Sequence, residues 1–356
     1  MGESKMRKGK VFGVALDASD DPFSLQLKQA AMDAREQGIE GLHADPYDAL
    51  SEELTRGLGF EPAGRFPVPS WLGPLPMVSD RERITAAAME RFVEEGGVLN
   101  LIDDLRAFVL KRIVPAAPVM LGIDHVATAG VVSALSEQLG AENLTIIVLD
   151  RHFDALPLSM RIAAFPGGRR AAPPLSGIGS STDALCCGNF WAHLIERRVV
   201  DPSHLVFLGV ADYPAEGTPP EWAAFRRGYL SFEEQGCRFF PLTAFREGYE
   251  EKLRDFLVAA VTTPYVYVSL DLDVGAYKAV RAARYMDGPG VDTGQLLSVA
   301  RIIGEAGREC GFSLAGLDVV EFNMHFLGLQ VGSGDKDQTA EIAVEFVKTL
   351  VRGIGE

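Results

Sequence analysis

The chain has 356 residues, of which 47% are hydrophobic, and 34 basic against 49 acidic residues give it a formal net charge of −15. This balance argues against binding to the phosphate backbone of nucleic acids, and no apolar run approaches the ~20 residues that a membrane-spanning helix needs. The four cysteines are too few for a disulfide scaffold, and the polar N-terminus leads into no signal-peptide pattern, so we expect a cytoplasmic protein.

Short apolar runs alternate with helical patterns along most of the chain. We expect strands at 10–17, 117–122, 143–150, 204–211, 265–273 and 314–322. Helical patterns separate them at about 126–140, 183–198, 243–261, 293–309 and 338–353. Because the expected strands are apolar almost throughout, both of their faces should be buried. The alternation predicts an α/β fold in which helices cover a parallel sheet on both sides.

Two segments depart from this alternation. The segment 61–76, EPAGRFPVPSWLGPLP, is rich in proline and is predicted to be an ordered loop or arm. The segment 157–182 is rich in Gly, Pro and Ser and is predicted to be a loop between a strand and the next helix. Since the βα pattern continues beyond this second segment, we expect residues 1–356 to form a single domain.

Three of the expected strands end in residues of the types that bind metal ions. The ends read GIDH, DRHFD and SLDLD, and they contain Asp124, His125, Asp150, His152, Asp154, Asp271 and Asp273. Sites in parallel sheets form where the carboxyl ends of the strands meet. In an extended segment, residues two apart point to the same side, so the members of each end should share a face.

The composition of these strand ends indicates a two-metal site. His125 and His152 with four carboxylates could bind two divalent cations, and this mixture of imidazole and carboxylate suits Mn²⁺. A single DxD pair is more often a turn or a helix cap, and a single histidine is more often a packing residue. The coincidence of ligand types at three strand ends favours the metal site over these simpler explanations.

These motifs resemble those of the ureohydrolase family, which includes arginase and agmatinase. The family's motifs GGDHS, DAHxD and SxDxDxxDP correspond here to GIDHV, DRHFD and SLDLDVGA. DPSHLVFLGV, GLDVVEFN and DQTA extend the resemblance, which covers roughly residues 110–352, whereas residues 1–110 match only in outline. The resemblance implies a three-layer α/β/α sandwich around a parallel sheet, assembled as homotrimers or homohexamers.

The resemblance also implies a role for each site residue. His125, Asp150, Asp154 and Asp271 would bind one manganese ion, and His152, Asp150, Asp271 and Asp273 would bind the other. Two cations would activate a bridging water as the nucleophile, and Asp154 would pass its proton to the leaving amine. Glu321 would bind the guanidinium of the substrate; we expect it to be buried and ionised, with no protein cation beside it.

This sequence departs from the family pattern in several places. Ile123 and Val126 replace Gly and Ser in the first motif, and the DP pair after Asp273 is absent. Cys187 stands where the family has a proton-shuttling histidine, and a thiol could act similarly only with a lowered pKa. Cys187 and Asn189 are expected to line the substrate site, which the segment 157–182 should help to shape.

Three hypotheses about function follow. The first is a dimanganese amidinohydrolase that releases urea and an amine from a small cationic guanidino compound, either agmatine-like or a guanidino acid. The second applies the same metal chemistry to a formimino or acylamino C–N bond. The third is a non-catalytic metal-binding homologue. The complete ligand set and Glu321 favour the first, and neither nucleic acid nor membrane is expected as a partner.

Overall fold

The computed structural model describes residues 8–39, 45–156, 184–214, 223–331 and 335–355. Its main sheet is 8-stranded, in the order β2-β1-β3-β8-β7-β4-β5-β6, and all neighbouring strands are parallel. The strands are β1 (Gly9–Val14), β2 (Glu61–Arg65), β3 (Ala117–Gly122), β4 (Leu144–Leu149), β5 (Leu205–Leu208), β6 (Arg238–Phe240), β7 (Tyr265–Asp271) and β8 (Ser313–Val320). A separate antiparallel pair is formed by β9 (Gln330–Val331) and β10 (Asp335–Lys336).

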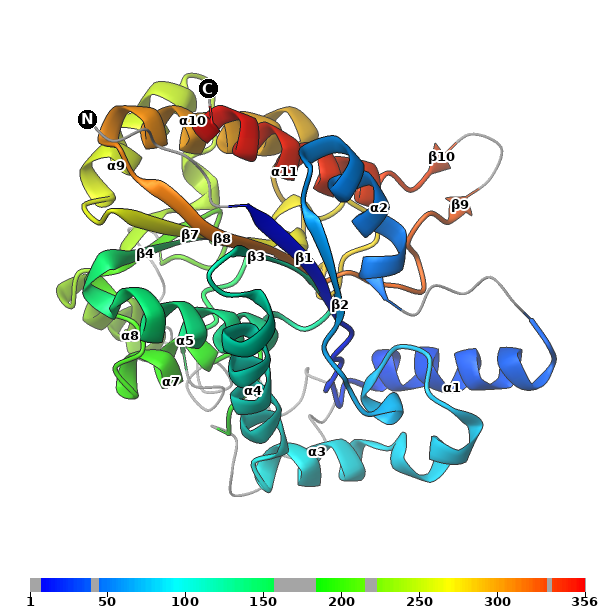
Figure 1. Cartoon of the computed structure of the whole chain (residues 1–356). Helices are drawn as coiled ribbons and strands as arrows, with labels where there is room; N and C mark the ends of the chain where they lie inside the picture. Colours follow the sequence, from blue (N-terminus) through cyan, green and yellow to red (C-terminus); the bar gives the residue numbers. More distant parts are fainter. Residues whose placement is uncertain (1–7, 40–44, 157–183, 215–222, 332–334, 356) are drawn as a thin grey trace.

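Helices cover both faces of the main sheet, as Figure 1 shows. The α-helices are α1 (Pro22–Glu36), α2 (Pro46–Leu58), α3 (Ala86–Glu94), α4 (Gly97–Phe108), α5 (Thr128–Leu139), α7 (Phe190–Glu196), α8 (Ala223–Glu234), α9 (Tyr249–Ala260), α10 (Thr293–Cys310) and α11 (Thr339–Gly355). Helices α2, α9, α10 and α11 lie on one face, and α4, α5, α7 and α8 lie on the other (Figure 1). The three-layer α/β/α arrangement expected from the sequence is therefore confirmed.

A hydrophobic core lies on each side of the sheet. Along β4, Ile147 and Leu149 belong to one buried cluster, whereas Ile146 and Val148 belong to the other. Successive strand residues point to opposite faces, so a strand covered on both sides must be apolar at every position. This is why the strand segments read as continuous apolar runs, and why the polar residues at their ends stand out in the sequence.

The six strands expected from the sequence are present, with ends that differ by a few residues, but two further strands of the main sheet and the pair β9–β10 were not predicted. The Pro-rich segment 61–76 was expected to be a loop or arm, and its first part instead forms β2, which pairs with β1 through Val11 and Pro62. Proline cannot donate a backbone hydrogen bond, so it is tolerated here because β2 is an edge strand. The other additional strand, β6, forms the opposite edge.

The first hundred residues contain helices that the sequence reading did not assign. Asp21 caps α1 by accepting the N–H of Ser24, and Asp45 caps α2 by accepting the N–H of Tyr47. In both helices a proline follows the cap at the first helical position. An Asp-Pro pair of this kind is a recognised helix-start signal, so these helices could have been predicted.

Two expectations about the whole chain are not decided by this fold. The segment 157–182, expected to shape the substrate pocket, lies outside the described residues, and the single-domain organisation of residues 1–356 stays a prediction. In the ranges that the structure describes, none of the helices has both the length and the apolar character that crossing a membrane requires.

Candidate metal centre

Four neighbouring strands bring the candidate site residues to the carboxyl-terminal end of the sheet. The strands β3, β8, β7 and β4 are adjacent in that order. His125 follows β3, the segment 150–154 follows β4, β7 ends at Asp271, and Glu321 directly follows β8. All these positions are at carboxyl ends, where parallel sheets form their ligand sites.

The first candidate ligand group surrounds the imidazole of His125. Its Nδ1 lies 3.3 Å from Asp150 Oδ2, 3.2 Å from Asp154 Oδ2 and 3.1 Å from Asp271 Oδ2. The four side chains are buried, and their ligand atoms all lie within 4.8 Å of one another. One imidazole and three carboxylates at this spacing can coordinate a divalent cation.

The second candidate ligand group consists of His152, Asp273 and, again, Asp150. His152 Nδ1 lies 2.6 Å from Asp273 Oδ2 and 3.9 Å from Asp150 Oδ1. Asp150 therefore presents one oxygen to each group, as a ligand shared by two cations would. The structure brings Asp271 into the first group, so its role as a second bridging ligand stays a prediction.

The candidate ligands converge through turns and not along extended strands. β4 ends at Leu149, and Asp154 has a φ of 48°, in the left-handed region. Asp271 caps the 3₁₀ turn η9 (Leu272–Gly275), where its Oδ1 accepts the N–H of Asp273 at 2.9 Å. The expected extended alternation is thus wrong, because alternate residues of a strand are about 7 Å apart, whereas a turn brings their side chains closer.

A chain of hydrogen bonds behind His125 fixes its ring. His125 Nε2 lies 3.1 Å from the hydroxyl of Ser269, which donates to Asp318 Oδ1 at 2.7 Å. Asp318 Oδ2 in turn accepts hydrogen bonds from the hydroxyls of Thr128 and Tyr267. Such contacts hold a ligand imidazole with its other nitrogen facing the metal position. Ser269 lies within the SLDLD motif, two residues before Asp271, which is the signal that could have revealed it.

The ring of His152 has a carboxylate partner that sequence reasoning missed. Its Nε2 lies 3.3 Å from Asp287 Oδ2, and the other oxygen of that carboxylate, Oδ1, accepts a hydrogen bond from Arg151 Nε. The backbone N–H of Arg151 donates to Asp273 Oδ1 at 3.0 Å. Asp287 lies in the loop after η9 and belongs to none of the motifs, so the sequence offered no signal for it.

Burial and crowding of like charges perturb the site carboxylates. Burial, together with the charges of Asp154 and Asp273, raises the pKa of Asp150 to about 7. Burial and the same crowding raise the pKa of Asp271 well above its usual range. Burial alone would lower the pKa of His125, but the surrounding carboxylates outweigh it and raise that pKa well above its ordinary value. The two imidazoles of the cluster thus supply too little positive charge to balance its carboxylates.

These residues fit a pair of divalent cations. His125 Nδ1 and Asp150 Oδ2 are both buried and make no hydrogen bond within the described part of the chain. Leaving buried polar atoms unsatisfied is costly, and a coordinated metal ion would satisfy both. The donors are imidazole nitrogens and carboxylate oxygens, a set that suits Mn²⁺ and similar cations.

Glu321 lies beside the first ligand group but has an unexpected neighbour. The side chain is 1% exposed, and its Oε1 accepts the N–H of His125 at 2.8 Å. Its Oε2 is buried without a hydrogen bond among the described residues, and lies 3.6 Å from Nη1 of Arg284. The expectation that no protein cation lies beside Glu321 is wrong, because the loop after η9 places Arg284 there. Burial raises the pKa of Glu321 to about 8, although Arg284 opposes this effect.

Cys187 and Asn189 lie in the turn before α7. Burial raises the pKa of the Cys187 thiol well above its usual value, with a contribution from Asp124, so the thiol stays protonated at neutral pH. The amide of Asn189 accepts the N–H of Cys186 at 3.0 Å and donates to the carbonyl of Ala184 at 2.9 Å. These contacts fold the turn, and direct contact of Cys187 or Asn189 with a substrate stays a prediction.

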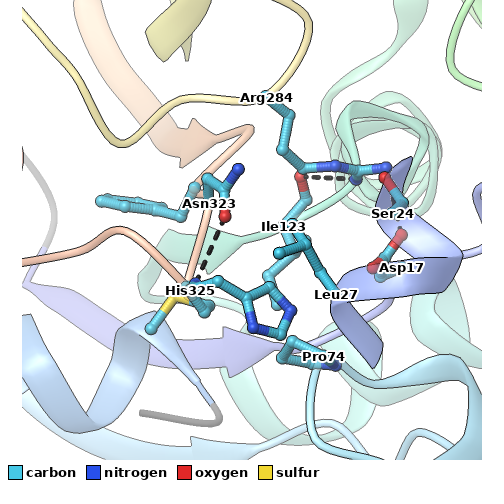
Figure 2. A pocket seen from close by; sticks show the side chains of 10 residues that line it. Asp17, Ser24, Leu27, Pro74, Ile123, Arg284, Asn323 and His325 are labelled. Atoms are coloured by element: carbon cyan, nitrogen blue, oxygen red, sulfur yellow. Dashed lines mark hydrogen bonds and ion pairs between the residues drawn. The ribbon is translucent and has the colours of Figure 1, made fainter. Parts of the chain in front are cut away.

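A small pocket lies beside Arg284 (Figure 2). Its lining residues are Asp17, Ser24, Leu27, Pro74, Ile123, Arg284, Phe322, Asn323, Met324 and His325. Arg284, one of the lining residues, lies 3.6 Å from Glu321 Oε2, so the pocket extends beside the carboxylate that bonds to His125. Asp17 and Ser24 show that the N-terminal hundred residues, which carry little of the resemblance, also line this region.

Comparisons with known proteins agree with the fold. Residues 43–352 match the sequence model of the arginase family. The fold is similar to that of proclavaminate amidino hydrolase from Streptomyces clavuligerus, with a TM-score of 0.57, 20% identity and coverage of 99% of this chain and 93% of that one. Formimidoylglutamase from Bacillus subtilis has a TM-score of 0.57 and 14% identity, with coverage of 99% of this chain and 89% of that one. Arginase from the same species has a TM-score of 0.54 and 19% identity, with coverage of 97% of this chain and 98% of that one.

The family match covers most of the chain, and the chain belongs to the arginase family. Members of this family are metal-dependent hydrolases of C–N bonds. No curated protein matches the chain by sequence. The structural relatives are at most 20% identical among those compared, so they support the fold and leave the substrate open.

Proposed function

We propose that this protein is a two-metal hydrolase of the C–N bond in a guanidino compound, either agmatine-like or a guanidino acid, and that it releases urea and an amine. The observation that carries the proposal is the pair of buried ligand groups that share Asp150, next to the open acceptor oxygen of Glu321. Two divalent cations, with Mn²⁺ as the first candidate, would supply an activated water.

The protein's own residues would bind and orient the substrate. Glu321 Oε2 is available to accept a hydrogen bond from a planar, cationic guanidinium, while Oε1 stays bonded to the N–H of His125. Asp154, in the first ligand group, would accept the proton of the water at its carboxylate and deliver it to the leaving amine. The half-buried Cys187 would contribute packing at the substrate side, because its protonated thiol is a poor proton carrier.

A second candidate is hydrolysis of a formimino or acylamino C–N bond by the same centre. The observation that favours it is the guanidinium of Arg284, 3.6 Å from Glu321 Oε2, which already supplies a cationic neighbour to that carboxylate. A non-catalytic metal-binding homologue is the third candidate. The burial of the ligand groups argues against it, since carboxylates crowded together in a buried cluster without a metal ion destabilise a fold.

One assay separates these candidates. Protein loaded with Mn²⁺ would be incubated with a panel of guanidino, formimino and acylamino compounds, and urea, ammonia, formamide and free amine would be measured. Urea release from a guanidino compound supports the proposal. Release of formamide, ammonia or a carboxylic acid without urea supports the second candidate, and absence of any product supports the third.

We also propose that the protein forms homo-oligomers and is located in the cytoplasm.

A further inference from the structure

Arg284 is held rigidly at the edge of the candidate site. Only 7% of the residue is exposed. Its Nη2 lies 3.0 Å from Asp17 Oδ1 and donates to the hydroxyl of Tyr285 at 3.0 Å, while its Nη1 donates to the carbonyl of Ile123 at 3.3 Å, a contact drawn in Figure 2. The backbone N–H of Arg284 donates to the carbonyl of Glu321 at 2.9 Å. The guanidinium is thus held by Asp17, Ile123 and Tyr285, and the backbone of Arg284 is held by Glu321.

Glu321, when it is ionised, completes a buried series of alternating charges. Lys28 is fully buried on α1, and its Nζ lies 3.4 Å from Asp17 Oδ2. Asp17 pairs with Arg284, and Arg284 lies 3.6 Å from Glu321. Asp124 is also buried and acts on both Arg284 and Glu321, so two cations lie among three carboxylates. Arg284 therefore supplies part, and not all, of the positive charge that balances Glu321.

A cation bound to Glu321 would lie close to Arg284. A donor that bonds to Oε2 at about 2.9 Å would be within roughly 6.5 Å of the Arg284 guanidinium, whatever its direction of approach. Like charges at this distance repel appreciably in a partly buried site. A neutral planar group of the same size would form the same hydrogen bond without this repulsion.

We propose that Arg284 is a specificity-determining residue, whose fixed positive charge beside Glu321 weakens the preference of the site for cationic reacting groups and admits uncharged ones such as an acylamino group. This inference rests on the proposed function, because it concerns the same substrate site. Arg284 acts on the substrate through its charge, and its position in a loop outside the motifs explains why the sequence did not reveal it.

Guanidinium and urea are suitable probes because they are planar, of nearly equal size, and differ in charge. Their dissociation constants would be measured by calorimetry or by NMR line shifts on the Mg²⁺-loaded or Mn²⁺-loaded full-length protein. Arg284→Met removes the charge but keeps much of the side chain's volume, while Arg284→Lys retains the charge. Lys28 remains beside Asp17 in both variants, so neither leaves that carboxylate without a cation.

The expected result is a change in the ratio of the two dissociation constants. In Arg284→Met, the preference for guanidinium over urea should increase by at least about tenfold relative to the wild type, whereas Arg284→Lys should resemble the wild type. If Arg284→Met fails to fold by circular dichroism, Arg284→Gln replaces it, since its amide can still donate to Asp17 or Ile123. An unchanged ratio in the neutral variant, or no binding of either probe to any variant, would overturn the proposal.

The same variants separate this inference from the function itself. In turnover assays with guanidino and acylamino compounds on the same carbon chain, Arg284→Met should shift kcat/KM toward the guanidino compound by a similar factor. If wild-type protein hydrolyses no compound, the proposed function fails, but the ratio of the probe dissociation constants still decides the role of Arg284. If hydrolysis occurs and both ratios are unchanged, only the role of Arg284 is wrong.

Discussion

At the scale of single residues, the positions of the candidate ligands could be predicted from the sequence, but the residues that surround them could not. His125, Asp150 and Asp271 could be predicted because each follows an apolar run, and parallel strands bring such ends together. Arg284 and Asp287 could not, because a loop without regular periodicity places them. Their contacts with Glu321 and His152 depend on the path of the chain after η9, which no local pattern specifies.

The charge of Glu321 should matter for guanidino substrates. Glu321→Gln keeps the shape and an oxygen that can accept the N–H of His125, but it removes the negative charge. We expect transition-state binding to weaken by roughly 2–4 kcal/mol, by analogy with the loss of a charged hydrogen-bond partner. The measurement is kcat/KM with guanidino compounds, and Glu309→Gln on the surface of α10 is the control. Unchanged hydrolysis of every guanidino compound would favour the acylamino or formimino alternative.

Asp154 combines two expected roles, and its substitution should affect both. Asp154→Asn removes a carboxylate of the first ligand group together with the proposed proton carrier. We expect turnover to disappear and the first site to lose metal affinity, so that bound metal falls from two ions toward one per chain. Elemental analysis after dialysis checks the second effect, with Asp104→Asn on the exposed face of α4 as the control. Full metal content with normal turnover would contradict both roles.

Metal binding should strengthen as the pH rises toward neutrality. The pKa of Asp150 is about 7 in the folded, metal-free protein, against about 3.9 in an unfolded chain. The raised value means that the metal-free fold favours the protonated form, so its stability decreases as the pH rises from about 4 to 7. A metal ion must displace this proton. The pKa values of His125 and Asp271 are also raised, so these ligands must lose protons as well. Titration calorimetry should therefore show affinity that increases as the pH rises to and beyond 7, with proton release on binding; a pH-independent affinity would contradict this.

At the scale of elements, the loop that follows η9 depends on close backbone approach. Gly290 donates its N–H to the carbonyl of Ala276 at 2.9 Å, and the next residue, Val291, bonds to Val274. These contacts anchor the segment that carries Arg284 and Asp287. The sequence predicted the strand before this loop and the helix after it, but the loop's path is set by tertiary contacts that no periodic pattern encodes.

Replacing Gly290 should disturb that anchor. A Cβ on Gly290 would lie 1.9 Å from the carbonyl oxygen of Val274, so the backbone must move. We expect Gly290→Ala to destabilise the fold by about 1–3 kcal/mol, as overpacking does, and to weaken the second metal site through Asp287. Gly57→Ala in α2 is the control, because its Cβ would meet only the end of the Lys348 side chain, 2.9 Å away, and Lys348 belongs to neither ligand group. Equal unfolding temperatures for the two variants would show that the anchor is unimportant.

At the scale of the whole molecule, the layer architecture follows from the sequence, whereas the N-terminal contribution to the site does not. Continuous apolar strands separated by helices allow few arrangements other than a covered parallel sheet. Residues 1–110 showed little of the resemblance, yet β1 leads to Asp17, which pairs with Arg284. A buried ion pair therefore links the segment after β1 to the surroundings of the candidate site.

Metal ions should stabilise the molecule as a whole, because the candidate ligands follow β3, β4 and β7, three strands of one sheet. A cation that binds only the folded chain at about 100 times its dissociation constant adds roughly 2.7 kcal/mol to the free energy of unfolding. At pH 8, scanning calorimetry should show a Tm higher by several degrees in Mn²⁺ than in EDTA. Asp150→Asn, which removes the shared ligand, should lose most of this difference, whereas Glu321→Gln should retain it. If Asp150→Asn gains as much stability from Mn²⁺ as the wild type does, the stabilising cation binds elsewhere, and the assignment of Asp150 to both ligand groups is wrong.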